Sequence, residues 1–149
     1  MPKRRREDFE SRYQECGTLF TGLRNWKLTR AIQATERLTW DFPDEPRAWF
    51  IHNLAVCLAN EEGGPYSGNQ QVTVRAAVHL GDRFDTIIFN DMRRDQASCL
   101  ITFARNPHDL HRAERMINGI ASAHAGDPSR QACLVDLRGR LAFARGKYS

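Results

Sequence analysis

The residues best suited to bind a ligand are two histidines and two arginines that follow the pair Asn106-Pro107. The asparagine side chain accepts a free backbone N–H and the proline suits the first helical position, so this pair predicts the start of a helix with its positive end here. Arginine binds phosphate through paired N–H donors. On that helix the cationic side chains share one face, and the apolar residues lie on the opposite face. The cationic side chains are His108, His111, Arg112 and Arg115. We therefore predict a phosphate-binding face.

The N-terminus is the second basic element. Its four cations account for the whole formal charge of +4, because the other 18 basic and 18 acidic residues cancel. Such a run serves as a nuclear-import signal or a nucleic-acid arm, and we expect residues 1–6 to be a disordered tail. Two tryptophans flank a predicted helix and can stack on bases or anchor a core. The remaining predicted nucleic-acid-binding residues are thus Lys3, Arg4, Arg5, Arg6, Trp26 and Trp40.

No spacing in the sequence identifies a catalytic group, a metal site or a cofactor. His108 and His111 lack a third ligand at a zinc-site spacing. The four cysteines are Cys16, Cys57, Cys99 and Cys133. They show no close spacing and each lies in an apolar run, which predicts buried thiols in a reducing compartment. We therefore expect neither an enzyme nor a cofactor.

Three runs between residues 72 and 104 predict an antiparallel β-meander. Val72 to Leu80 alternates with period two, Phe84 to Phe89 is rich in β-branched and aromatic residues, and Ser98 to Phe103 supplies a third strand. The short connections favour antiparallel pairing over parallel crossovers. We therefore expect an α+β fold, with N-terminal helices before this sheet and two C-terminal helices packed on it.

Helical patterns occupy most of the remaining chain. The N-terminal helices are expected at about residues 8–23, 25–39 and 46–60, and the C-terminal helices at about 107–124 and 129–144. Residues 61–71 contain three glycines and one proline, which predicts a loop. With 41% apolar residues, residues 7–149 are expected to form a single globular domain.

The predicted order of elements resembles a known RNA-binding module. Helix, three antiparallel strands and helix, from Pro46 to Ala123, look like a double-stranded-RNA-binding domain, whose last helix begins with basic residues that grip phosphates. In this chain that helix begins Asn106-Pro-His-Asp-Leu-His-Arg112. The resemblance implies RNA binding by this helix.

A different resemblance implies an all-α fold. Tyr13-x-x-Cys-Gly-x-x-Phe20 is similar to the W-x-x-L-G-x-x-Y spacing of the tetratricopeptide repeat, and Gly139 with Gly146 and Tyr148 resembles the end of its first helix. Ala31 to Pro46 and Ala113 to Pro128 also share one spacing. This alternative requires residues 72–103 to be helical.

Three functional classes follow from these features. The first is an RNA- or other nucleic-acid-binding module, a regulatory or viral accessory protein that acts through Arg–phosphate contacts and aromatic stacking. The alternative is a protein-interaction adaptor or inhibitor without nucleic-acid binding, with a homodimer as a further option; an enzyme ranks third. No apolar run approaches 18 residues and no signal peptide follows the basic start, so we expect no membrane partner and a cytoplasmic or nuclear location.

Overall fold

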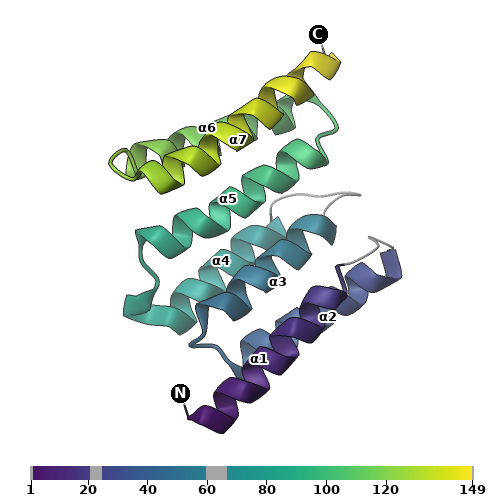
Figure 1. Cartoon of the computed structure of the whole chain (residues 1–149). Coiled ribbons are helices and arrows are strands. Elements are labelled where there is room, and N and C mark those ends of the chain that lie inside the picture. Colours follow the sequence, from purple (N-terminus) through teal and green to yellow (C-terminus); the bar gives the residue numbers. More distant parts are fainter. Residues whose placement is uncertain (1, 21–24, 60–66, 149) are drawn as a thin grey trace. The chain divides into compact units, whose positions relative to one another are not determined.

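The computed structural model describes residues 2–20, 25–59 and 67–148, and every α or β element in these ranges is a helix (Figure 1). Short 3₁₀ turns follow the fourth and the seventh α-helix, at Gly81–Arg83 and Gly146–Tyr148. The α-helices are α1 (Lys3–Thr18), α2 (Asn25–Asp41), α3 (Pro46–Ala59), α4 (Ser67–Leu80), α5 (Thr86–Thr102), α6 (Pro107–Ala123) and α7 (Pro128–Arg145).

The predicted β-meander is wrong, and with it the α+β fold. Its first run lies in α4, where Val72, Ala76 and Leu80 are buried on one side of the helix. These residues recur every four positions, a spacing that fits both the even period of a strand and one face of a helix. Packing against α3 selects the helix here, because β-propensity depends strongly on tertiary context.

The second and third runs belong to one helix, α5, instead of two strands. The polar segment 90–96, which lies between the second and third predicted strands, continues this helix, and its residues Asn90 and Gln96 are buried. Ala97 and Ile101 add apolar residues to the buried side. Because the described residues form no sheet, the likeness to a double-stranded-RNA-binding domain no longer holds, and the all-helical alternative fits the structure.

Local capping chemistry predicted the C-terminal helices well. The Asn106 side chain accepts a hydrogen bond from the Asp109 backbone N–H at 3.0 Å at the start of α6. Asp127 accepts one from the Arg130 backbone N–H at 3.2 Å at the start of α7. The first helix differs more, since it spans Lys3–Thr18 instead of about 8–23. Of the predicted loop at 61–71, residues 61–66 lie outside the described ranges and 67–71 begin α4.

The chain divides into two compact units, Met1–Asp85 and Thr86–Ser149, and the single globular domain expected for residues 7–149 stays a prediction. In the first unit, α1, α2 and α3 bury a cluster around Phe9, Leu38 and Phe42. In the second unit, α5, α6 and α7 share one core that is rich in leucine and isoleucine. Its fully or nearly fully buried members are Ala97, Ile101, Leu110, Ala113, Ile117, Ile120, Leu134, Leu137, Leu141 and Ala144.

The helices start at a regular interval along the sequence. α1, α3, α5 and α7 begin at Lys3, Pro46, Thr86 and Pro128, so these starts are 43, 40 and 42 residues apart. The intervals fall within the range of repeats built from helix pairs, about 40–47 residues. Positions about 42 residues apart can therefore be compared between helices.

Candidate partner-binding surface

The predicted N-terminal cations lie in the first turns of α1 rather than in a separate tail. Lys3, Arg4, Arg5 and Arg6 are all exposed. The Arg5 guanidinium donates to the backbone carbonyl of Asp41 at 3.1 Å and forms an ion pair with Asp44 at 3.7 Å. It also lies 5.1 Å from the centroid of the Phe42 ring. Arg5 thus participates in the packing of the first unit.

Arg5 is one member of an arginine–aromatic cluster in the first unit, formed by Phe9, Tyr13, Phe42, Arg5, Arg12 and Arg47. Phe9 and Phe42 meet edge to face with ring centroids 5.2 Å apart. The Arg47 guanidinium lies 4.8 Å from the Phe9 centroid, and Arg12 lies 5.4 Å from that of Phe42. Cations over aromatic faces are attracted by the ring quadrupole, so the arginines cover these rings.

Acidic residues pair with the arginines of this cluster. Arg12 forms an ion pair with Asp41 at 2.8 Å, and Arg47 pairs with Glu10 and, at 3.2 Å, with Glu45. The hydrogen bond from Arg47 lowers the pKa of Glu10 below its ordinary value, because it favours the ionised carboxylate. The positive charges of these arginines are therefore balanced by carboxylates of the same unit.

The tryptophans predicted to stack on bases lie in α2. Trp40 is 66% exposed, whereas the side chain of Trp26 lies outside the described part of the chain. Trp49 is buried, and its indole N–H donates to the Pro43 carbonyl at 2.9 Å. The His79 ring stacks on it, with centroids 5.5 Å apart. Trp49 is thus a core anchor.

One histidine of the first unit is buried beside a threonine. His52 Nδ1 lies 3.0 Å from the Thr35 hydroxyl, which also donates to the Ala31 carbonyl at 2.7 Å. Burial, aided by the positive charge of Arg75, lowers the pKa of His52 to about 4. The ring is therefore neutral at pH 7 and contributes to the packing between α2 and α3.

The predicted cationic face of α6 exists in the second unit. His108, His111 and Arg115 are exposed and Arg112 is half-buried, while Leu110 and the other apolar residues of α6 are buried on the opposite side. The predicted nucleic-acid-binding residues thus divide between the two units. Their binding of nucleic acid stays a prediction.

The net charge of the chain resides in the second unit. Met1–Asp85 contains twelve Lys or Arg and twelve Asp or Glu residues, so its formal charges cancel. Thr86–Ser149 contains ten and six, which gives it +4. The net formal charge is therefore carried by this unit, because the N-terminal cations are balanced by acidic residues elsewhere in the first unit.

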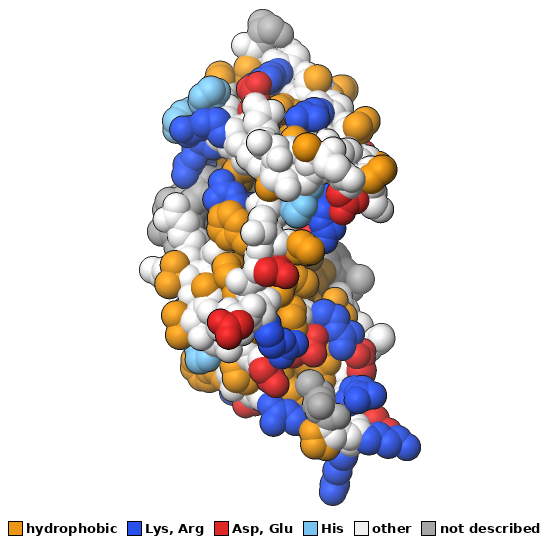
Figure 2. All heavy atoms as spheres, turned by 90° about the vertical axis from the view of Figure 1, so that its left-hand side faces the viewer, with side chains coloured by type: hydrophobic (Ala, Val, Ile, Leu, Met, Phe, Trp, Pro, Cys, Tyr) orange, Lys and Arg blue, Asp and Glu red, His pale blue; other side chains and the backbone are white. Residues whose placement is uncertain are grey.

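Helix α7 carries an exposed apolar surface that was not predicted from the sequence. This outer face of α7 consists of Ala132, Val135, Gly139, Ala142 and Phe143, all of them exposed. Val135 and Phe143 are 67% and 75% exposed. Leu134, Leu137 and Leu141 lie on the opposite side of the helix and are buried. On the face of the molecule shown in Figure 2, hydrophobic side chains likewise reach the surface between charged ones.

The corresponding face of α5 is covered. Counting back 42 residues, Ala132, Gly139 and Phe143 of α7 correspond to Asn90, Ala97 and Ile101 of α5, all of which are buried. Ala97 and Ile101 join the core formed with α6 and α7, and the Asn90 amide lies 3.0 Å from His124 Nε2 at the end of α6. Three positions that are exposed on α7 are thus buried on α5, whereas Arg93 and Leu100, the counterparts of Val135 and Ala142, are half-buried.

A groove between α6 and α7 borders this outer face. Its volume is about 190 Å³, its lining includes the buried residues Ile117 and Leu141, and Arg138 and Arg145 also line it. Arg145 pairs with Glu114 across the groove. Arg138 has no ion pair with any described residue. The groove therefore combines an apolar floor with one unpaired cation.

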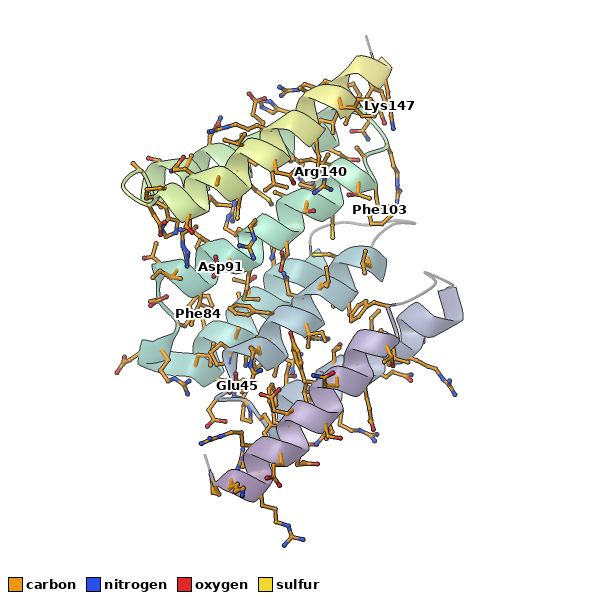
Figure 3. The ribbon with its side chains drawn as sticks, viewed as in Figure 1. Glu45, Phe84, Asp91, Phe103, Arg140 and Lys147 are labelled. Carbon is orange, nitrogen blue, oxygen red and sulfur yellow. The ribbon has the colours of Figure 1, made fainter. Side chains whose placement is uncertain are left out.

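The side of α7 away from the groove is fixed to α5. Arg140 donates to the Ser98 and Thr102 hydroxyls at 2.9 and 2.6 Å and to the Ser98 carbonyl at 3.3 Å (Figure 3). Arg130 forms an ion pair with Asp91 of α5 at 3.5 Å. These contacts position α7 so that its outer face stays exposed.

The described residues contain neither a metal-binding group nor a membrane-spanning helix. No group of three His, Cys, Asp or Glu side chains among them could hold a metal ion. Of the cysteines predicted to be buried, Cys16 and Cys57 are, whereas Cys99 is half-buried and Cys133 is exposed on α7. None of the described helices has the length and apolar character needed to cross a membrane.

Comparison of the chain with protein-family models, with curated proteins and with solved structures gives no significant match.

Proposed function

We propose that this protein is a protein-interaction adaptor whose second unit binds a helix of a partner through the outer face of α7. The supporting observation is the exposed apolar face itself, at five positions whose counterparts on α5 are buried in three cases and half-buried in the other two. An amphipathic helix that lays its apolar face on such a surface is a common recognition mode.

The dimensions of α7 suit this mode. Its 18 residues give a surface about 27 Å long. Gly139 and the two alanines of the outer face are small, so a second helix can approach closely between the larger side chains of Val135 and Phe143. Phe143 is the expected anchor, because large aromatic residues dominate the binding energy of many interfaces.

A selection from a displayed library of helices tests this proposal. The library contains amphipathic helices of about 18 residues, with apolar residues at i, i+3, i+4 and i+7, and the full chain is the bait. We expect selected helices to lose at least about tenfold in affinity when Val135 and Phe143 are both changed to serine, since each buried apolar side chain contributes about 1.5–3 kcal/mol.

The matched control uses α4 in the first unit. Val74 and Val78 are 63% and 72% exposed there, so changing both to serine removes a comparable amount of apolar surface. We expect this control to bind the selected helices as the wild type does. Failure to select any helix, or equal losses in the two double variants, would contradict the proposal.

Nucleic-acid binding is the competing outcome. We would test for nucleic-acid binding by titrating the full chain with duplex RNA, single-stranded RNA and DNA across a salt range. Binding that weakens in an Arg112→Ala, Arg115→Ala variant but not in the Val135→Ser, Phe143→Ser variant would favour a nucleic-acid-binding module over an adaptor.

A further inference from the structure

We infer that the partner helix is acidic on one side and that its carboxylates bind at the α6–α7 groove through Arg138 and Arg145. This inference rests on the proposed function and specifies the chemistry of the partner. The second unit is positively charged, since it contains ten basic and six acidic residues. Complementary charge speeds association and selects among partners.

The arginines of α7 differ in how far they are already engaged. Arg130 pairs with Asp91 and Asp127, and Arg140 is hydrogen-bonded to α5. Arg145 shares its charge with Glu114, whereas Arg138 has no ion pair with a described residue. Arg138 is therefore the cation of α7 best able to accept a carboxylate from outside.

The position of Arg138 fits this role. Arg138 and Arg145 are seven residues apart, two turns of the helix, and both line the groove. They border the outer face on its α6 side, next to Ala142. A helix whose apolar residues cover Phe143 and Ala142 would therefore bring the residues beside its apolar stripe to these two guanidinium groups.

The two borders of the outer face carry opposite charges. On the side away from the groove, the outer face is bordered by exposed Asp136, which lies about 20° around the helix axis from Phe143. A partner helix with its acidic residues toward α6 pairs with Arg138 and Arg145, whereas the reverse orientation places them beside Asp136. The charges thus set the rotation of the bound helix about its axis.

A second copy of this chain is a poorer occupant than an acidic helix. Two copies that meet through α7 would bring two units of charge +4 together. They would also place an unpaired Arg138 from each copy in one interface, where like charges are unfavourable. The same surface attracts a helix of opposite charge.

Two displayed libraries test the inference with the full chain. Both keep the same apolar positions, and their polar positions are drawn from Glu, Gln and Ser in one library and from Lys, Gln and Ser in the other. We expect binders from the acidic library only. Their affinity should fall about two- to fivefold in Arg138→Gln, the effect of one partly exposed ion pair, and the loss should shrink at high salt.

Arg115→Gln is the control, because it removes one exposed positive charge from α6 outside the groove. We expect it to weaken binding less than Arg138→Gln does. Equal effects of the two substitutions would show attraction by overall charge and overturn the inference about the groove. Equal enrichment of both libraries would overturn the acidic partner while leaving the adaptor function intact. If neither library is enriched, the proposed adaptor function itself is contradicted.

Discussion

The two units use the same residue types, arginine and aromatic side chains, to different effect. In the first unit Arg5, Arg12 and Arg47 lie over aromatic rings and are each paired with a carboxylate. In the second unit Phe143 is largely exposed, with only the Lys147 ammonium 5.5 Å from its ring, and Arg138 has no acidic partner among the described residues. The acidic residues account for this difference. They pair with the arginines of the first unit, whereas an arginine without such a pair can bind a partner.

The largest effect is expected in the core of the first unit. Trp49→Ala should lower the free energy of unfolding by about 3–5 kcal/mol, because it removes a fully buried indole. Chemical denaturation followed by circular dichroism measures the change. The control is Trp40→Ala on exposed α2 surface, where we expect a change within about 0.5 kcal/mol. Similar losses in both variants would show that Trp49 does not anchor this unit.

Ile117→Ala should cost about 2–4 kcal/mol in the second unit. The side chain is 1% exposed and belongs to the core shared by α5, α6 and α7. Phe143→Ala is the matched comparison on α7 and should change stability by less than about 0.5 kcal/mol, because its ring is already in solvent. A large loss in Phe143→Ala would mean that the outer face is covered in solution, which would remove the contrast between the units.

His52 gives the first unit a pH dependence. Its pKa is lowered from 6.5 to about 4, so as the pH falls the unfolded chain takes up this proton before the folded chain does. The neutral ring contributes at most about 3 kcal/mol to the free energy of unfolding. This contribution is complete above about pH 6.5 and is lost as the pH falls toward 4.

Urea denaturation at pH 7, 5.5 and 4 of the wild type and His52→Gln measures this dependence. We expect the difference in unfolding free energy between the two proteins to narrow as the pH falls, since glutamine does not titrate. The lowered pKa of Glu10 affects both proteins alike and cancels in that difference. A difference that stays constant from pH 7 to 4 would show that His52 is protonated in the fold or is exposed.

The smallest expected effect on stability is the difference between an arginine with cation–π contacts and ion pairs and an arginine without an ion pair. Arg47→Ala should cost about 1 kcal/mol, because it removes cation–π contacts with Phe9 and Tyr13 in addition to partly exposed ion pairs. Arg138→Ala, in the second unit, should be close to neutral, since Arg138 has no ion pair with the described residues. Thermal denaturation of both variants in one buffer makes the comparison. A neutral Arg47→Ala would show that the arginine–aromatic cluster contributes nothing to stability.

Short-range chemistry explains which helices were predictable. The starts of α3, α6 and α7 each carry a proline at the first position, and α6 and α7 add a side-chain cap from Asn106 and Asp127. Such signals act within one turn and need no knowledge of the rest of the fold. The bounds of these three helices were therefore predicted to within one or two residues.

The errors in α4 and α5 arose where tertiary contacts decide. Val72, Ala76 and Leu80 fit either a strand or a helix by spacing, and their β-branched and apolar neighbours tilted the prediction toward strands. In α5 the buried amides Asn90 and Gln96 made a helix interior resemble a loop. Only contacts with neighbouring helices distinguish these cases.

The candidate site was visible in the sequence only in part. The cationic face of α6 followed from helical spacing. The spacing of Ala132, Val135, Gly139 and Phe143 is equally helical, yet a second apolar face gains meaning only when the neighbours of the helix are known. The structure supplies those neighbours.

The sequential order of the helix contacts bears on how fast the chain folds. The most extensive packing within each unit joins helices adjacent along the chain, α2 with α3 and α5 with α6, and α5 with α7 is the pair furthest apart in the second unit. Such local topologies fold in microseconds to milliseconds, whereas the predicted sheet would have required slower, more distant pairing. Each helix can therefore dock soon after it forms, which limits the time during which its apolar core residues are exposed to aggregation.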